Sequence, residues 1–171
     1  MSHSSVQVEE SIYINTPREQ LWEITALQFD QIGLWSAGVK VSEGQGKGIN
    51  GAVCKERLCT PSYKGFAKTT ERIIEYKPNK FEFTYSIVSG LPSMVTKATN
   101  RWTHTSQSDG TRIKMEVNMS LKGFVGKIMK GPMQKKMKKI LRQNLEELKT
   151  FAETGSLHER KQKLNKKLKS N

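Results

Sequence analysis

The stretch Ile113-Lys-Met-Glu-Val-Asn-Met-Ser-Leu121 decides the fold, together with the change of pattern that follows it. Apolar residues occupy every second position, which predicts a strand with one apolar face and one solvated face, as in an antiparallel sheet. After Gly123 the apolar residues recur at steps of three and four, which predicts an amphipathic helix. They are Met133, Met137, Ile140, Leu141, Leu145, Leu148 and Phe151.

This helix has two expected boundaries. Gly155 is a typical C-terminal stop, because glycine adopts the left-handed conformation that often ends helices. Gly131-Pro132 is expected to interrupt the helix and separate a short piece over 124–130, because proline lacks the backbone N–H and clashes with the preceding turn.

The chain before this segment reads as further strands and two short helices. Thr16-Pro17-Arg18-Glu19 predicts a helix start, with Thr16 as N-cap and Glu19 closing a capping box, and a second short helix is expected over 29–35. The strands are expected at 6–14, at 52–58 after a glycine-rich hairpin, and at 64–76, 81–87, 94–106 and 113–121.

The hairpin contains Gly46-x-Gly48-x-x-Gly51, which matches the dinucleotide-binding pattern in spacing. That pattern must follow a strand and open a helix, so that the pyrophosphate meets the helix N-terminus. Here the following residues read as a strand instead. We therefore expect a hairpin, and no cofactor is implied.

Length and composition fit one domain. The 171 residues are 35% hydrophobic, which allows an ordinary core. The N-terminus shows no signal-peptide pattern and no apolar run is long enough to cross a bilayer, so we expect a cytoplasmic protein. Cys54 and Cys59 are expected to be free thiols, and C-x4-C with few histidines does not predict a metal site.

The net charge of +13 is unevenly distributed. Residues 123–171 carry 14 Lys+Arg against 4 Asp+Glu, whereas residues 1–122 carry 15 against 12. We therefore divide the chain into a domain at 1–155 and a basic tail at 156–171, which is either helical or disordered. An anionic membrane surface is a possible partner of the basic helix and tail, a solvated face being the alternative. The sequence does not predict a nucleic-acid partner, because the sheet lacks a stripe of aromatic and basic residues for stacking bases.

The order of elements resembles a known superfamily. A strand, two short helices, a glycine-rich hairpin, a meander and a long C-terminal helix resemble the START/Bet v 1-like (SRPBCC) superfamily, and within it the polyketide cyclase/dehydrase and lipid-transport group. The resemblance covers residues 6–153. Its local marks are Ile14-Asn-Thr-Pro17, Gly46-Lys-Gly48, Glu71-Arg-Ile-Ile-Glu-Tyr76 and Tyr85-Ser-Ile-Val-Ser-Gly-Leu-Pro92.

The resemblance implies an α+β helix-grip fold, in which a curved antiparallel sheet of about seven strands surrounds the long helix and encloses an apolar cavity. Bulky aromatic and methionine side chains suit a flexible hydrophobic ligand. Plain core packing is the alternative for each of them. The expected lining is Phe83, Tyr85, Trp102, Met115, Val117, Met119, Met133 and Met137.

Three residues are candidates for acid–base chemistry. The superfamily's inward parity would place Glu56 and Glu71 on neighbouring strands inside the cavity, where one carboxyl would have a raised pKa. A shift of one residue would replace them with Arg57 and Arg72, and surface or salt-bridged glutamates are the ordinary interpretation. His104 is a candidate general base, although no nucleophile motif accompanies it, and a hydrogen-bonded or solvent-edge histidine is the ordinary interpretation.

Two functions follow from these patterns. The first is binding or transport of a lipid-like or polycyclic hydrophobic molecule. The second is a polyketide cyclase or dehydratase that uses Glu56, Glu71 or His104 for proton transfer. Because no catalytic signature is present, the sequence favours a binding protein over an enzyme.

Overall fold

A computed structural model describes residues 3–64 and 66–170. The strands are β1 (His3–Ile14), β2 (Val39–Gln45), β3 (Glu56–Pro61), β4 (Thr69–Lys77), β5 (Glu82–Ser89), β6 (Val95–Gln107) and β7 (Gly110–Lys122). The helices are α1 (Arg18–Trp22), η1 (Glu23–Leu27), η2 (Phe29–Gln31), α2 (Ile32–Trp35), η3 (Pro78–Lys80), α3 (Gly123–Thr154) and α4 (Glu159–Lys169).

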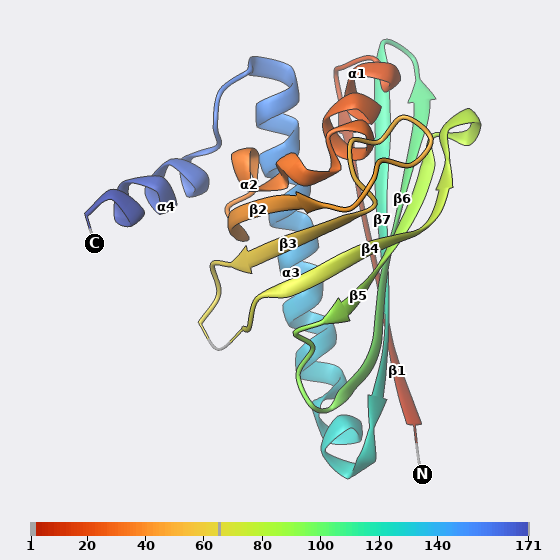
Figure 1. Cartoon of the computed structure of the whole chain (residues 1–171), viewed down its shortest axis with the longest axis vertical. Helices are drawn as coiled ribbons and strands as arrows, with labels where there is room; N and C mark the ends of the chain where they lie inside the picture. The colour runs from red at the N-terminus through yellow and green to blue at the C-terminus, as the bar shows by residue number, and fades with distance from the viewer. Residues whose placement is uncertain (1–2, 65, 171) are drawn as a thin grey trace.

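The seven strands form one antiparallel sheet in the order β1-β7-β6-β5-β4-β3-β2. β1, β6 and β7 run nearly parallel to α3, whereas β2, β3 and β4 cross it, so the sheet curves around the helix (Figure 1). The predicted α+β helix-grip architecture with about seven strands is therefore confirmed. The alternation at 113–121 is confirmed as well, because Ile113 to Leu121 are buried at every second position of β7.

The predicted break at Gly131-Pro132 is wrong, because α3 is one continuous helix that contains Pro132. Both residues are exposed, so water can satisfy the carbonyl that loses its partner at the proline. The predicted end is confirmed, since Gly155 has a φ of 70° and donates its N–H to the Phe151 carbonyl.

The first helical segment begins near the predicted position but without the predicted capping box. The cap position is Pro17, no side-chain capping bond forms there among the described residues, and α1 continues into the π-helical turn η1. Leu21 and Trp22 are buried. Packing against the sheet therefore holds this short helix in place.

The strand after the glycine-rich hairpin begins later than predicted. Ala52 forms only an isolated bridge with Ile49, and β3 begins at Glu56. Both cysteines are free, as predicted.

The tail forms helix α4, and its first turn packs on the domain. Arg160 donates to the carboxylates of Glu146 and Glu147 on α3. The ammonium of Lys161 is buried and donates to the Val39 carbonyl at 2.8 Å. The remaining lysines of α4 are exposed.

Candidate functional site: a cavity between the sheet and α3

A cavity of about 440 Å³ lies between the curved sheet and α3. Its walls come from β2–β7, α2, α3 and the loops that join β3 to β4 and β5 to β6. The exposed lining residues mark its rim, where Phe66, Pro92, Met129, Pro132 and Lys136 gather. The Lys136 ammonium lies 4.5 Å from the centre of the Phe66 ring, so α3 and the β3–β4 loop meet across this rim.

The wall of the cavity is largely apolar. Strand β7 contributes three of the predicted residues, and α3 contributes two more, with Met129 beside them. Methionines are unbranched and adapt to irregular shapes. The predicted residues that line the cavity are Tyr85, Met115, Val117, Met119, Met133 and Met137.

Phe83 and Trp102 are not among the lining residues, so the prediction for these two is wrong. Both are 2% exposed. Trp22 packs edge-on against Phe83 at 5.9 Å, and Phe83 stacks on Trp102 at 5.8 Å. The short helix α1 therefore fills this end of the concave face with an aromatic core.

His104 lies in the same aromatic core and does not line the cavity. Its Nδ1 lies 3.0 Å from the Phe81 carbonyl, which can only accept, so Nδ1 carries a proton. Its Nε2 lies 2.8 Å from the Thr25 hydroxyl, whose single proton also has the Leu21 carbonyl as an acceptor at 2.8 Å. Burial lowers the pKa of His104 to about 4. The ring is neutral at pH 7 and both nitrogens are occupied, so the geometry does not support a general base here.

The expected pair of neighbouring carboxylates is wrong, because β3 has the other parity. Glu56 lies opposite Arg72 and bonds to it at 2.6 Å on the outer face, whereas Arg57 points inward and lies opposite Glu71. Only Glu71 of the three candidate groups lines the cavity. An ion pair replaces the proposed acid pair.

The Arg57–Glu71 ion pair is the main polar group on this wall, and the sequence did not show that these two residues meet. Arg57 is 3% exposed; its Nε and Nη2 lie 2.7 and 2.6 Å from Glu71 Oε2, and Nη1 donates to the Phe29 carbonyl at 2.6 Å. Its guanidinium also covers the Phe29 ring at 4.0 Å. Burial by itself would lower the pKa of Arg57, but Glu71, Cys59 and Tyr85 together outweigh it, so the pKa lies above its ordinary value. Nearby, burial raises the pKa of the Cys59 thiol to about 12.

A buried tyrosine and asparagine lie close to this ion pair. Asn100 donates to the Tyr85 hydroxyl at 3.0 Å, and burial raises the pKa of Tyr85, so the phenol stays protonated. Asn100 is 6% exposed, and its Oδ1 has no hydrogen-bond partner among the described residues. Buried polar atoms are nearly always paired. Asn100 and Tyr85 therefore add a polar, internally hydrogen-bonded place to the cavity wall.

A second polar group lines the cavity from α3. Glu147 accepts from the Ala37 backbone N–H and from Arg160, both at 2.8 Å. Asn144 donates to Ser36 Oγ at 2.9 Å, and its own Oδ1 is buried without a partner among the described residues. The cavity thus has a methionine-rich middle with hydrogen-bonding groups in two places.

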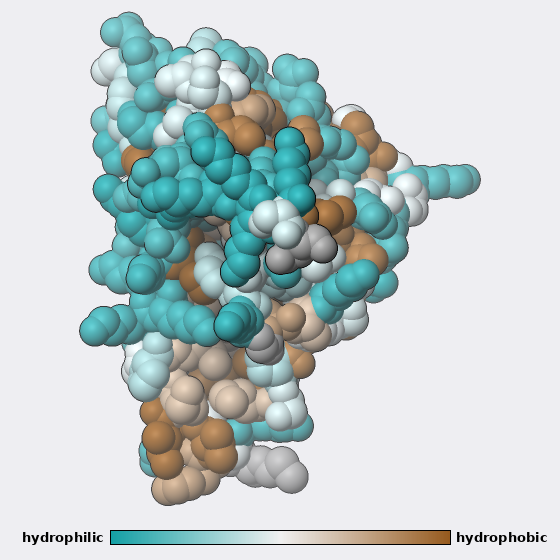
Figure 2. Space-filling view, turned by 90° about the vertical axis from the view of Figure 1, so that its left-hand side faces the viewer, coloured by the Kyte–Doolittle hydropathy of each residue, from teal (hydrophilic) through white to brown (hydrophobic). Residues whose placement is uncertain are grey.

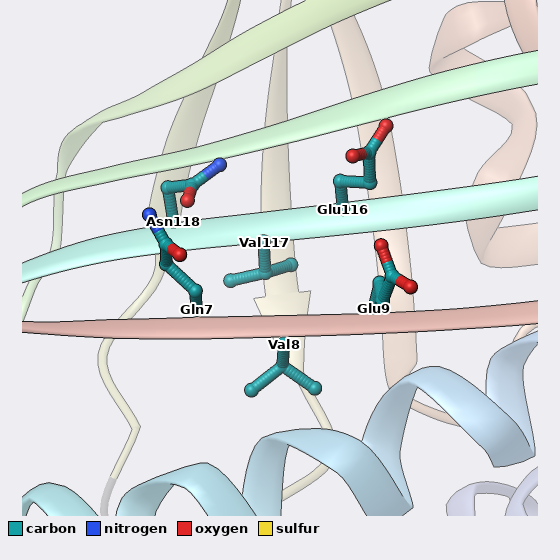
Figure 3. Close-up of a pocket in the computed structure, with 6 residues that line it drawn as sticks. All are labelled: Gln7, Val8, Glu9, Glu116, Val117 and Asn118. Carbon is teal, nitrogen blue, oxygen red and sulfur yellow. The ribbon is translucent and has the colours of Figure 1, made fainter.

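A second, shallow depression lies on the opposite face of the sheet, between β1 and β7 (Figure 3). Glu9 lies opposite Glu116 in the register, and Gln7 lies opposite Asn118. These four side chains point away from α3, whereas Val8 points toward it (Figure 3). Lys114 neutralises Glu116 at 3.1 Å. We interpret this depression as part of the solvated outer face.

Within residues 3–64 and 66–170, no cluster of three or more His, Cys, Asp or Glu side chains forms a metal site. In the same part of the chain, no helix combines the length and apolar character needed to span a bilayer.

Comparisons with known proteins agree with this geometry. Residues 5–153 match the model of the family described as polyketide cyclase/dehydrase and lipid transport. Among curated proteins, none matches the chain.

Several solved structures share the fold. A START superfamily protein from Mycobacterium smegmatis superposes with a TM-score of 0.71 at 16% identity, covering 91% of this chain and 100% of its own. Ara h 8.0201 gives 0.62 at 16% identity, with 85% and 98% covered. The di-domain ARO/CYC protein StfQ from the steffimycin biosynthetic pathway gives 0.71 at 14% identity, with 87% of this chain and 51% of that chain covered. At such identities the likeness shows the fold alone.

Proposed function

The chain belongs to the polyketide cyclase/dehydrase and lipid transport family, and from this premise we propose that it binds a hydrophobic small molecule in the cavity under α3. The observation that carries the proposal is the cavity itself, about 440 Å³ with a wall built largely from methionine, valine and other apolar side chains. Ligand pockets in proteins measure about 300–1,000 Å³ and combine apolar walls with few polar groups.

The polar groups on the wall indicate the kind of molecule. Asn100 and Asn144 bring amide groups to the wall, and Glu71 and Glu147 add carboxylates. Each of these groups favours a hydrogen-bond donor on the ligand. We therefore propose a lipid-like or polycyclic molecule that carries one or two hydroxyl or other donor groups.

Native mass spectrometry of gently purified protein, beside an organic extract of the same preparation, tests this proposal. The expected result is a bound species that organic solvent releases, or stoichiometric uptake of added fatty acid, sterol or dansyl-undecanoic acid. A chain that stays empty in the presence of all these compounds would overturn the proposal.

A second candidate function is a cyclase or dehydratase, favoured by one observation: the Glu71 carboxylate and the Tyr85 phenol both line the cavity. In this version Glu71 accepts a proton from the bound substrate, and Tyr85 supplies a hydrogen bond. Glu71→Gln would then abolish turnover of a polyketide-like substrate while leaving its binding measurable. Unchanged turnover in Glu71→Gln would reject this role.

The basic helix and tail add a proposed partner, an anionic membrane surface from which such a ligand would be taken. The exposed lysines of α3 and α4 support this contact. Each basic residue near an anionic surface contributes about 1 kcal/mol.

A further inference from the structure

The first turns of α3 expose a group of large apolar side chains, which we name the apolar tip: Phe124, Val125, Ile128 and Met129. They are 77%, 58%, 60% and 36% exposed. On a helix these positions are neighbours, since residues four apart lie one above the other. Figure 2 shows the lower end of the molecule, where α3 begins, as a brown and tan surface. A contiguous exposed patch of this kind marks an interaction site more often than scattered apolar residues do.

The chain holds the apolar tip in a fixed position. Gly123, with a φ of 73°, turns the chain from β7 directly into α3. Gly126 is buried against the end of β7, where an added Cβ would come within 2.9 Å of the Leu121 Cβ. The close approach at Gly126 anchors the first turn, so Phe124 and Ile128 are presented on a packed helix.

The described segments next to the apolar tip carry positive charge and contain no acidic residue. Residues 117–145 contain eight Lys+Arg and no Asp or Glu. Lys122, Lys127 and Lys130 flank the tip and are exposed. The other two segments at this end of the molecule, residues 3–8 and 86–99 (Figure 1), also contain no acidic residue. An anionic partner therefore meets no repulsion from acidic side chains of these three segments.

The apolar tip also adjoins the rim of the cavity. Met129 belongs to both the tip and the cavity wall, and Pro132 and Met133 continue the wall along α3. Leu91 and Pro92 of the β5–β6 loop line the wall as well. A surface that covers the tip would thus face this part of the rim.

We propose that the apolar tip inserts into the surface of an anionic lipid bilayer while the flanking lysines contact the headgroups. A lipid surface accounts for both the apolar tip and the flanking lysines. Phe124 and Ile128 can insert at the boundary between headgroups and acyl chains, and the anionic headgroups attract the lysines. Nucleic acid would use the lysines but leave the apolar side chains without a partner. Docking of the apolar tip does not depend on what the cavity holds. Only a role of the tip in ligand exchange rests on the proposed function.

Vesicle co-sedimentation of the full chain tests the apolar part. The protein is expected to bind phosphatidylcholine vesicles that contain about a third phosphatidylglycerol, and to bind pure phosphatidylcholine more weakly. Phe124→Ser/Ile128→Ser is expected to weaken binding to the anionic vesicles at least about tenfold, because two bulky side chains leave the lipid. The matched control is Ile74→Ser on the outer face of β4, where the side chain is 55% exposed; its binding stays unchanged. No binding to anionic vesicles, or equal binding by the tip variant, would overturn the proposal.

Lysine substitutions on α3 and on α4, made in separate variants, test the charged part of the proposed contact. Lys127→Gln/Lys130→Gln weakens vesicle binding about tenfold or more, whereas Lys166→Gln/Lys167→Gln on α4 changes it less. The reverse order would assign docking to the tail and contradict the proposal. Binding of a short DNA duplex that is as tight as vesicle binding and insensitive to Phe124→Ser/Ile128→Ser would identify a polyanion site instead.

Ligand uptake by the same variants distinguishes a failure of membrane docking from a failure of ligand binding. Without vesicles, Phe124→Ser/Ile128→Ser is expected to take up dansyl-undecanoic acid as the unmodified chain does, because neither side chain lines the cavity. A chain that docks but takes up no ligand would refute the proposed function alone. A chain that takes up ligand but does not dock would refute the apolar tip alone.

Discussion

The same strands build both halves of the sheet's concave face, but one half is filled with side chains and the other encloses the cavity. In the packed half, Phe83 and His104 lie under Trp22 of α1, and Trp102 stacks on Phe83 to complete an aromatic core. In the hollow half, the same face lies under the methionines of α3 and encloses the cavity. The inward residues of β6 change accordingly, from Trp102 and His104 to the smaller Asn100 and Ala98. Alternation tells which face is inside, but side-chain size and the covering helix decide where the space remains.

The largest expected effect is a difference in stability between the two halves. Trp102→Ala removes a side chain enclosed on all sides and is expected to cost about 3–5 kcal/mol of unfolding free energy. Met119→Ala enlarges a space that already exists, so fewer contacts are lost, and we expect at most about 2 kcal/mol. Urea unfolding of both variants measures the difference. Equal costs would contradict the distinction between a packed and a hollow half.

A second comparison sets the inner ion pair of β3 and β4 against the outer one. Arg57→Met leaves Glu71 without its cation in the cavity wall and is expected to cost about 3–5 kcal/mol. Arg72→Met breaks the exposed pair with Glu56 and is expected to cost at most about 1 kcal/mol.

The double variant Arg57→Met/Glu71→Leu serves as the control for this pair. It removes both charges, and we expect it to recover most of the lost stability. If the double variant is as unstable as Arg57→Met, the loss comes from packing around Phe29 rather than from the unpaired carboxylate.

The packed half also predicts a dependence of stability on pH. The pKa of His104 is about 4 in the folded chain, against about 6.5 when unfolded. The unfolded chain therefore binds the proton first, and stability falls as the pH drops from about 6.5 to about 4, by up to about 3 kcal/mol. His104→Phe should lose this part of the slope in urea unfolding at several pH values. An unchanged slope would show that other groups cause it.

The patterns of β7 and α3 were predictable from the sequence, because the spacing of apolar residues is a local property of each segment. The alternation at 113–121 and the apolar steps along α3 both correspond to buried positions. The ends of elements were less predictable, since Pro132 is tolerated inside an exposed part of α3.

The candidate site was only partly predictable. β3 is a short strand with Glu, Arg, Leu and Cys in sequence, so either parity was open, and only pairing with β4 places Arg57 inside. Trp102 and Met115 are opposite each other in the register, yet only Met115 reaches the cavity. The position of α1 above Trp102 is a tertiary fact that no strand pattern contains. The small residues Ala98 and Asn100 were the feature of the sequence that indicated where β6 leaves space for the cavity.

The central claim is that the space under α3 is a ligand cavity, and filling it tests this claim most directly. Ala98 lines the cavity on β6 and is 3% exposed, so Ala98→Phe should occupy the space. Thr105→Phe adds the same ring at an exposed position of the same strand. Uptake of dansyl-undecanoic acid, followed by fluorescence, is expected to fall at least about tenfold in Ala98→Phe and to stay unchanged in Thr105→Phe, with both chains folded. Full uptake by folded Ala98→Phe would contradict the account.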